Sequence, residues 1–527
     1  MARDGTVAAK GRCKVCVRNT ETEPMKPNLK ILATSSLVIA ALNSAHAQYT
    51  PPPPPIPFPG FINDYLRKQD PYNSVWDIGG AVRVRYELKE GGLGLPPAND
   101  FRATTTATTR NNNEFLSSKI LARVAYTDKW WSAYVEGRSS ETWGDARSNT
   151  GAGAVPGPGG GNGPETDGPV DLHQAYFTLG NHKEFPVSLK VGRQELSYGD
   201  ERLVGAFAWN NIGRVFDAAK VRWQNSWFSA DAFVSKLVLP DDNEFNTWND
   251  YNLFSGVHLS SKKIPKTLTE VYFFARNEDV GSSSALNPGA VLPFVVPAPA
   301  ARDIYTVGAR FKSATNELGN FDYTVEGAYQ FGDWQGAAGG AHLDHNAYAF
   351  MANIGYTIPE TATMPRFAVE YAFGSGDSNP ADSKHETFDN LYPTNHKFYG
   401  YMDFLSWQNL HDVRAIFSIK PTPRSSLSLE GHMFWAADTA DNIYNAGGVA
   451  RGAGATAGTG FGRNPTYDSK LGSEVDVVAG YALNKFTTLE AGYGHFFVGD
   501  YIKQTWSSPT IGAKDADWFY MQAVIRF

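Results

Sequence analysis

The sequence predicts an all-β fold, a single transmembrane antiparallel β-barrel of about 18 strands with short periplasmic turns and long extracellular loops. Three observations predict it. Apolar and polar residues alternate along many segments of strand length, short and long connections alternate between those segments, and charged residues keep to one parity. Successive side chains of a strand point to opposite faces, so this alternation gives a sheet with one apolar and one polar face.

The first 47 residues have the pattern of an export signal. A short basic segment begins at Met25, an apolar run covers residues 31–42, and Ala45-His46-Ala47 matches an A-x-A cleavage site. The apolar run is too short to cross a bilayer as a helix. We therefore expect residues 1–47 to be a signal peptide with an N-terminal extension, with translation starting at Met1 or Met25.

Both cysteines, Cys13 and Cys16, fall within that signal segment. A zinc site needs about four ligands, and the sequence has no second CxxC pair. We therefore expect no thiol chemistry, disulfide or metal site in the exported chain. From residue 48 onward the chain holds 40 Lys and Arg against 51 Asp and Glu, which argues against a nucleic-acid partner.

Residues 48–78 are predicted to be a periplasmic leader, followed by the barrel at residues 79–527. The leader contains five consecutive prolines, Pro51–Pro55, which favour an extended polyproline conformation. Beyond the signal segment, no apolar run is long enough for a membrane helix. Barrel strands do not produce such runs, because only alternate residues face lipid.

Alternation with a period of two identifies eighteen candidate strands. The last one, which ends at Phe527, resembles the terminal strand of bacterial outer-membrane β-barrels in its length, alternation and final aromatic residue. The candidates lie near residues 79–88, 117–126, 131–139, 171–179, 187–195, 216–223, 227–236, 253–260, 268–276, 304–312, 321–331, 347–357, 366–374, 411–419, 427–435, 474–482, 487–497 and 517–527.

The connections between these segments alternate strictly between short and long. Outer-membrane barrels have this asymmetry, and an even number of strands leaves both ends of the barrel in the periplasm. We therefore expect the protein in the bacterial outer membrane. Short connections include 127–130, 224–226, 262–266 and 484–485; long ones include 140–170, 277–303, 375–410 and 436–473.

Charge keeps to one parity of the candidate strands. In residues 321–331 one parity carries only aromatic residues, valine and glycine, whereas the other includes Asp322 and Glu326. An arginine or lysine in lipid near the middle of a bilayer costs about 2–4 kcal/mol, so the uncharged parity is expected to face lipid. The polar parity then lines the lumen, and a barrel of about 16–18 strands is wide enough for an aqueous channel.

The basic residues of the inward parity have two interpretations, and the sequence leaves both open. One interpretation is that they form one side of a salt-bridged wall that stiffens the barrel. The other interpretation is a basic stripe that attracts an anionic solute, since guanidinium groups bind carboxylates in a forked geometry. These residues are Arg83, Arg85, Arg123, Arg138, Lys220, Arg222, Arg276, Arg310 and Arg414.

The most unusual segment, residues 192–223, reads GRQELSYGDERLVGAFAWNNIGRVFDAAKVRW. It mixes aromatic and charged residues, among them Asp200, Glu201 and Trp209. Aromatic rings stack on sugar faces while Arg, Asp and Asn bind hydroxyl and carboxylate groups. The segment therefore has the chemistry of a saccharide site.

Arg193 conflicts with simple alternation. Leu189 and Val191 are expected to face lipid, and the same parity would point Arg193 toward lipid. A bulge at Gly192, or the end of the strand there, would remove the conflict.

This segment resembles the alginate-export family of bacterial outer-membrane proteins. The resemblance rests on GRQEL, YGDERL and W-x-N-x-GR-x-FD within residues 192–217, on Arg83-Val84-Arg85-Tyr86-Glu87, and on the strand rhythm. Membership implies a monomeric barrel with an arginine-rich constriction for acidic polysaccharide. Carried over by position, the constriction would hold Arg193, Asp200, Arg202 and Arg214, with Arg83, Arg85, Arg123 and Arg138 on the nearby wall and Trp209 packed or stacked in the inserted loop.

The function expected from these features is a passive channel for an anionic polysaccharide or oligosaccharide. An open polymer channel would leak, and the outer loop 196–215 is the best candidate for folding inward as a plug. A general or sugar-uptake porin is the alternative, since acids of the C-terminal half dilute the basic lumen. Expected partners are the saccharide, outer-membrane lipid and lipopolysaccharide, the barrel-assembly machinery and periplasmic secretion proteins.

An outer-membrane hydrolase is a less favoured alternative. His258 and His432 lie on the inward parity with Ser260 and Ser428 nearby, but no nucleophile elbow, HExxH motif or phosphate-binding loop accompanies them. We therefore expect no enzyme, no catalytic residue and no cofactor. The acidic loop 241–244 lacks the spacing of an EF-hand, so no calcium site is expected there.

Overall fold

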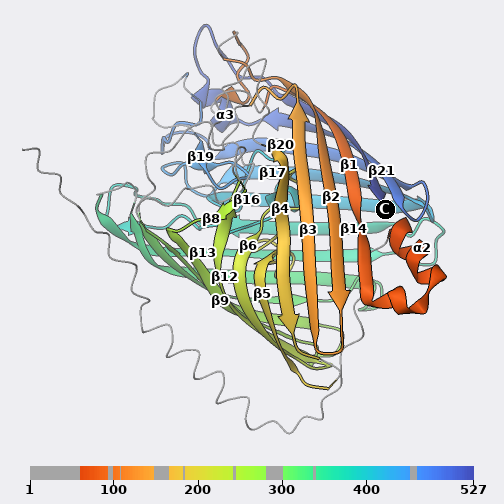
Figure 1. Ribbon diagram of the computed structural model, residues 1–527. Helices are drawn as coiled ribbons and strands as arrows, with labels where there is room; N and C mark the ends of the chain where they lie inside the picture. Colours follow the sequence, from red (N-terminus) through yellow and green to blue (C-terminus); the bar gives the residue numbers. More distant parts are fainter. Residues whose placement is uncertain are drawn as a thin grey trace, which may run out of the picture. The chain divides into compact units, whose positions relative to one another are not determined.

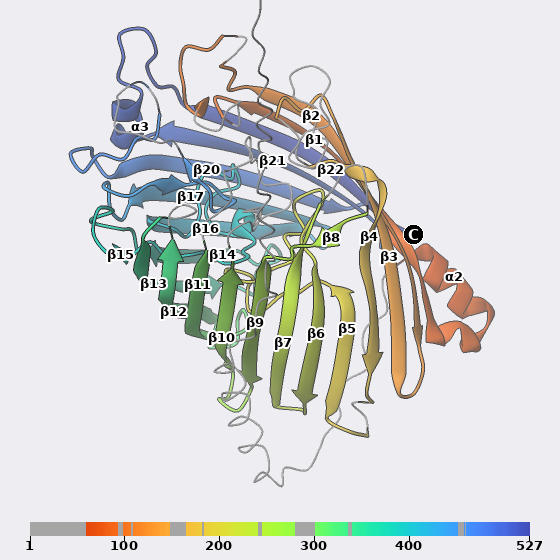
Figure 2. The same cartoon turned by 60° about the vertical axis from the view of Figure 1, so that its left-hand side comes forward.

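The computed structural model describes residues 60–92, 99–106, 109–147, 165–181, 184–240, 245–279, 301–335, 340–451, 458 and 460–527. Within these ranges, eighteen antiparallel strands form a closed barrel (Figures 1 and 2). The last strand, β22 (Ala516–Arg526), pairs with the first, β1 (Trp76–Glu90), over ten residue pairs. The predicted fold class and strand number are therefore confirmed.

Every predicted strand has its counterpart in the structure, and the differences lie at the ends. The strands between the first and the last are β2 (Asn113–Thr127), β3 (Trp131–Trp143), β4 (Asp167–Leu179), β5 (Val187–Gln194), β6 (Phe216–Gln224), β7 (Phe228–Leu239), β9 (Asn252–Ser261), β10 (Leu268–Glu278), β11 (Arg302–Lys312), β12 (Phe321–Gln335), β13 (His342–Thr357), β14 (Arg366–Gly374), β16 (Leu410–Thr422), β17 (Ser425–Ala436), β20 (Lys470–Ala482) and β21 (Thr487–Val498).

Shorter elements lie outside these wall strands. Two strands pair with the wall, β8 with β7 and β15 with β13, while β18 and β19 pair with each other. The elements are helices α2 (Phe61–Gln69) and α3 (Asp500–Thr505), 3-10 helices η1 (Pro71–Val75) and η3 (Asn395–Lys397), and strands β8 (Thr247–Trp248), β15 (Lys384–His385), β18 (Ile443–Tyr444) and β19 (Ala450–Arg451).

Burial along the strands has the reverse of the pattern in a water-soluble protein. In β13, Tyr348 and Phe350 are 52% and 43% exposed, whereas Ala347, Ala349 and Met351 between and beside them are at most 2% exposed. On this strand the aromatic side chains point outward, and the two alanines and Met351 face protein that fills the lumen. The outward parity is therefore the surface that meets lipid.

Aromatic residues form a band at the periplasmic ends of β1 to β4. Rings contact one another in sequence around the wall, from Trp76 to Tyr126 at 4.9 Å, to Trp131 at 5.1 Å and to Phe177 at 5.5 Å between centroids. We call these four residues the periplasmic girdle. Aromatic girdles mark the level of the lipid headgroups in outer-membrane barrels.

The strict alternation of short and long connections fails at one place. β12 ends at Gln335 and β13 begins at His342, so six residues connect them, fewer than the eight in each neighbouring periplasmic turn. The two strands stay paired as far as Gln335 and His342. Backbone hydrogen bonds continue above the membrane where the apolar alternation has stopped, so sequence periodicity underestimated both strands.

The segment predicted as a periplasmic leader includes α2 and η1, which no periodicity predicted. No helix in the described ranges is long and apolar enough to cross a membrane. The signal segment with Cys13 and Cys16, the prolines at 51–55 and the acidic loop 241–244 lie outside the described residues.

A charge placed on the lipid face should destabilise the barrel. Val307, at the centre of β11, is 42% exposed on the outward parity. We expect Val307→Arg to lower the free energy of unfolding by about 2–4 kcal/mol, measured by urea titration in phospholipid vesicles, because the guanidinium group would enter hydrocarbon. Val307→Leu is the control and should change it little. A loss below about 1 kcal/mol for the arginine variant would contradict the assigned face.

Candidate functional site

Two outer connections fold back into the barrel. We call residues 195–215, between β5 and β6, the first inserted segment, and residues 375–409, between β14 and β16, the second inserted segment. Val204 of the first and Tyr392 and Trp407 of the second are at most 1% exposed and belong to one apolar core with wall residues such as Phe254. The inward folding predicted for residues 196–215 is confirmed.

The second inserted segment was predicted only as a long outer loop. Its sequence carries a signal that composition could have revealed, because HKFYGYMDFLSW at residues 396–407 is far more aromatic than a solvated loop requires. In the structure Tyr399, Phe404 and Trp407 from this run are buried. Dense aromatic residues in an outer loop therefore indicated insertion here.

The two inserted segments hydrogen-bond to each other. The amide of Tyr392 donates to the carbonyl of Leu203, and the amide of Gly205 donates to the carbonyl of Tyr392, both at 2.8 Å. A Cβ atom at Gly205 would lie 2.4 Å from the hydroxyl of Thr394, so only glycine allows this approach. The two segments thus form one body inside the lumen.

Basic side chains of the wall hold the backbone of the first inserted segment. Arg83 donates to the carbonyl of Trp209 at 2.8 Å, Arg85 to the same carbonyl at 2.9 Å, Lys119 to that of Asn210 at 2.7 Å and Arg138 to that of Ile212 at 2.7 Å. We call Arg83, Arg85, Lys119 and Arg138 the basic clamp. Its members come from β1, β2 and β3, so neighbouring strands present four cations to one turn.

Trp209 lies at the centre of the clamped turn. Its ring stacks on the His396 ring of the second inserted segment, with centroids 3.9 Å apart and an interplanar angle of 11°. The Arg85 guanidinium lies 4.0 Å from the centroid of the indole ring, and the ring of Tyr520 meets it edge-on at 5.0 Å. Trp209 therefore joins β1, β22 and both inserted segments.

Two arginines of the first inserted segment bind the second inserted segment. Arg214 donates to the carbonyls of Gly205, Tyr392 and Pro393 at 2.7, 2.6 and 3.0 Å. Arg202 donates to Glu370 of β14 at 2.7 Å and to the Tyr399 hydroxyl at 3.2 Å. Burial opposes the charge on Arg202, but Glu370, Tyr399 and Glu326 together raise the pKa of the guanidinium group.

Asp200 and Glu201 pair with cations on different elements. Asp200 binds Arg310 and Lys312 of β11, each at 2.7 Å, and Glu201 binds Lys397 of the second inserted segment at 2.8 Å. Burial opposes ionisation of Asp200, but Arg310 and Lys312 outweigh it and lower the pKa of the carboxyl group.

Arg193 lies apart from the other predicted constriction residues. β5 pairs with β4 and β6 without a register shift at Gly192 and ends at Gln194, so neither the expected bulge nor an earlier strand end is found. Arg193 stays on the outward parity, where it pairs with Asp217 at 2.9 Å and donates to the carbonyl of Leu172 at 3.2 Å. The ion pair neutralises the charge that alternation places on that face.

Most other inward arginines form the contacts of a salt-bridged wall. Arg123 pairs with Asp77 at 3.2 Å, and Arg222 pairs with Asp231 at 2.5 Å. The C-terminal half repeats this arrangement with Arg310 and Glu270, and with Arg414 and Glu430. Arg276 pairs with Glu278 of its own strand and also with Asp389 of the second inserted segment. The charge of each of these arginines is therefore neutralised, in part or in full, by a carboxylate close to it.

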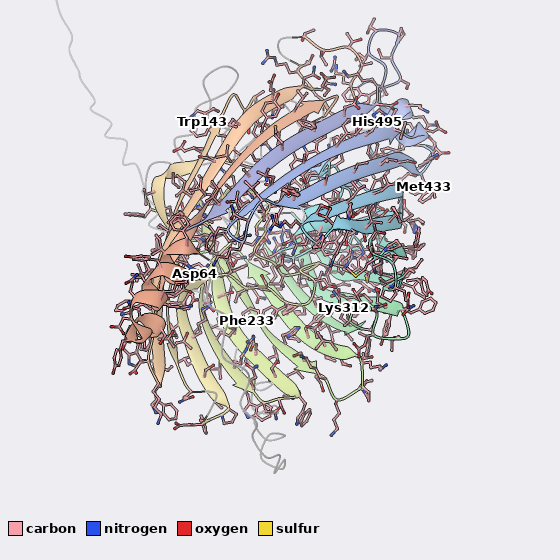
Figure 3. All side chains as sticks on the ribbon, turned by 90° about the vertical axis from the view of Figure 1, so that its right-hand side faces the viewer. Asp64, Trp143, Phe233, Lys312, Met433 and His495 are labelled. Atoms are coloured by element: carbon pink, nitrogen blue, oxygen red, sulfur yellow. The ribbon has the colours of Figure 1, made fainter. Side chains whose placement is uncertain are left out.

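A polar chamber lies beside the inserted segments, toward the periplasmic turn that follows β11. Its volume is about 500 Å³. Figure 3 labels Lys312, one of its lining residues. The charged residues that line the chamber are Arg202, Lys312, Arg366, Lys397, Asp200, Glu201, Asp322 and Glu370.

A second group of cations faces the lumen on the paired strands β5 and β6, where Lys190 lies opposite Thr178 of β4, beside the girdle residue Phe177. Lys190 lies directly opposite Lys220, and Arg222 is two residues further along β6. Asp231 binds Arg222 and lies 3.6 Å from Lys220. In the part of the chain that the structure describes, no carboxylate pairs with Lys190, whose ammonium lies 3.5 Å from the centroid of the Tyr176 ring. We call Lys190, Lys220 and Arg222 the periplasmic basic cluster. Lys190 was not among the predicted lumen residues, although it shares the inward parity of its strand.

The histidines considered for a hydrolase contact carboxylates of the wall. His258 lies 3.4 Å from Glu270, and His432 lies 3.0 Å from Asp412. The hydroxyl of Ser260 bonds with Ser229 at 2.8 Å. In the described ranges no three His, Cys, Asp or Glu side chains are arranged to hold a metal ion.

Removing Arg83 should loosen the clamped turn. Arg83 bonds to the carbonyls of residues 208 and 209 and to the side chain of Asn211, and a hydrogen bond to a charged group contributes about 1.5–3 kcal/mol. We expect Arg83→Ala to speed amide hydrogen exchange of residues 207–212 by about tenfold or more. Arg366→Ala is the control, since Arg366 pairs with Asp322 on another part of the wall. Unchanged exchange in this turn would show that Arg83 does not hold it.

Comparisons with known proteins agree with this architecture. The family model for alginate export matches residues 76–510. No curated protein sequence matches the chain. Among solved structures it is similar to OccAB1 of Acinetobacter baumannii, with 10% identity, 86% of this chain and 97% of that chain covered, and a TM-score of 0.50.

Two further structures give similar values. OpdQ of Pseudomonas aeruginosa has 11% identity, coverage of 86% and 97%, and a TM-score of 0.48. A BenF-like porin from Pseudomonas fluorescens Pf-5 has 9% identity, coverage of 86% and 99%, and a TM-score of 0.48. At a sequence identity of 9–11%, the similarity to these three structures concerns the fold alone.

The family match covers both inserted segments, the basic clamp and nearly the whole barrel. It indicates a transport channel rather than an enzyme, and a location in the bacterial outer membrane. With its closed barrel of eighteen strands, the chain belongs to the alginate-export family.

Proposed function

We propose that this outer-membrane channel passes an anionic saccharide of the alginate type, which first binds the periplasmic basic cluster. The observation that carries the proposal is the direct pairing of Lys190 with Lys220 across β5 and β6. Like charges directly opposite each other destabilise a sheet. An anion between the two ammonium groups removes that cost, and a uronate carboxylate is such an anion.

The charge around this pair supports the proposal. Among the described residues, Asp231 is the carboxylate that forms ion pairs with the cluster, so three cations share one ion-paired acid. The Arg222 side chain is 40% exposed, which leaves its edge accessible from the lumen. A guanidinium group beside two ammonium groups matches a chain that carries a carboxylate on each sugar.

The polar chamber is the next place along the proposed route. Its cations Lys312 and Lys397 have side chains that are 40% and 49% exposed, although each is paired with an acid of the first inserted segment. Such a site binds a passing carboxylate weakly by exchange of partners. Weak binding at several sites suits conduction, because a solute must be able to leave each one.

Passage then requires the inserted segments to move, since they occupy the lumen. The basic clamp holds its turn through neutral carbonyl oxygens. Carboxylates accept stronger hydrogen bonds from guanidinium groups than carbonyls do. We propose that a polyanion competes for Arg83 and Arg138 and thereby loosens the turn. In this proposal the arginines at the constriction still bind the acidic saccharide, as predicted. Without saccharide they bind carbonyl groups of the first inserted segment.

A general or sugar-uptake porin is the second candidate. The observation in its favour is the polar chamber, whose charged lining has four cations and four carboxylates. A neutral oligosaccharide would pass such a lining as readily as an anionic one. Equal rates of liposome swelling with neutral and anionic oligosaccharides of the same length would support this candidate. The predicted contacts with lipopolysaccharide, barrel-assembly machinery and periplasmic secretion proteins remain predictions.

Neutralising the periplasmic basic cluster should weaken anion binding. We expect Lys190→Gln with Lys220→Gln to raise the concentration of oligouronate that half-blocks the ion current about tenfold, because roughly 1.4 kcal/mol of attraction is lost. The measurement is planar-bilayer conductance with oligouronate added from the periplasmic side. The block should also weaken as salt concentration increases, since exposed charges are screened.

Lys236→Gln is the matched control, because Lys236 pairs with Asp250 and lies opposite Asp217 on the outward parity. It should leave the block unchanged. Equal block of the double variant and the parent would refute the assignment of the cluster, and absence of any ion current in the parent would refute the channel itself.

A further inference from the structure

Helix α2 is fixed to the place where the barrel closes. The Phe61 ring lies 5.9 Å from that of Phe486 and 6.3 Å from that of Phe527, the last residue of the chain. The amide of Ile78 in β1 donates to the Asn63 side chain at 2.6 Å, and Lys485 pairs with Asp64. The helix therefore crosses the periplasmic ends of β21, β22 and β1 (Figure 3).

Two aromatic residues of α2 are exposed, whereas its buried residue is an asparagine. Phe61 and Tyr65, which are 47% and 63% exposed, lie with the exposed Lys68 on one face, because positions i, i+4 and i+7 of a helix align. The opposite face carries Asn63, which is 2% exposed and donates to Asp77. In water a helix would bury its aromatic residues and expose its asparagine. This helix presents two aromatic rings outward.

The exposed face of α2 continues the surface that meets lipid. Phe527 lies on the outward parity, where its ring covers Gly80 so closely that a Cβ atom there would be 2.6 Å from it. Phe61 packs on that ring, and Arg67 donates to the carbonyl of Trp76 in the periplasmic girdle at 3.2 Å. The aromatic face of α2 therefore adjoins the outward side of the barrel through Phe61 and Phe527, and Arg67, on another side of the helix, ties α2 to the girdle.

Cations accompany the aromatic residues along this edge. The ammonium of Lys485 lies 4.6 Å from the centroid of the Phe486 ring, and that of Lys263 lies 5.1 Å from the Trp227 ring. Lys68 repeats the combination on α2, beside Tyr65. An aromatic ring at the headgroup level with a lysine reaching the phosphate is the usual arrangement of an interfacial anchor.

We infer that α2 is a membrane-interface helix whose Phe61, Tyr65 and Lys68 face rests on phospholipid headgroups of the periplasmic leaflet. The occupant is lipid because the face continues an established lipid surface and is small. A specific protein partner needs about 800 Å² on each side, which one nine-residue helix cannot supply by these three residues. The helix then holds the β1–β22 closure at the bilayer surface. This inference does not depend on the solute.

Fluorescence of a label on α2 tests the inference. The full chain with Cys13→Ser and Cys16→Ser leaves no other cysteine, so Tyr65→Cys takes a single nitrobenzoxadiazole label. The labelled protein is reconstituted into phosphatidylethanolamine and phosphatidylglycerol vesicles. We expect blue-shifted emission and at least twofold stronger quenching by a lipid nitroxide near the headgroup than by aqueous iodide.

Ser507→Cys, at an exposed position of an outer loop, is the matched control and should be quenched mainly by iodide. The inference is overturned if the label at position 65 behaves like this control, or if it becomes shielded only after periplasmic extract is added. Lys68→Cys provides a second labelling position should the first variant fail to show heat-modifiable migration. A label there should show the same preference for the lipid nitroxide, and a preference for iodide would overturn the inference.

Discussion

The structure depends on the requirement that every backbone amide and carbonyl in lipid has a hydrogen-bond partner within the protein. Pairing of β22 with β1 meets that requirement, because it leaves the wall without an open edge. Closure by eighteen strands fixes a wide cylinder. A wide cylinder creates a second requirement, because its interior must be occupied or remain open to water. The two inserted segments occupy it, and the exposed aromatic residues outside and the buried alanines inside both follow from this division.

The same requirement explains the role of the arginines. A loop that enters the lumen brings carbonyl groups with no strand to pair them, and buried unpaired carbonyls are costly. The basic clamp supplies donors from three strands to one turn, and Arg214 supplies three bonds from within the segment. Under the proposed function, the guanidinium groups that bind these carbonyls at rest would bind carboxylates of the solute during passage. Closure of the channel and recognition of the solute would then use the same residues.

Sequence periodicity predicted the strands correctly where one face contacts lipid. It did not predict the strand ends outside the membrane or the segments that fold into the lumen. The ends of β12 and β13 were underestimated because pairing continues beyond the apolar alternation. Insertion of residues 375–409 was missed, although their aromatic content indicated it. Neither alternative offered for Arg193, a bulge at Gly192 or the end of the strand there, is found, because Asp217 on the neighbouring strand neutralises Arg193. The position of Lys190 in a basic cluster became evident only from the strand register, which places it opposite Lys220.

The sequence by itself determined the barrel, its strand number, its lipid-facing parity and the segment that carries the family pattern. Contact with lipid requires apolar side chains on alternate positions of each strand. This requirement concerns residues close together in the chain, so the sequence shows it directly. Only the tertiary structure decided which arginines pair with acids, which hold the inserted backbone and which cations remain to face the lumen. Those outcomes depend on neighbours far apart in the chain, such as Arg85 and Trp209 or Arg202 and Glu370, whose proximity arises only after the barrel closes.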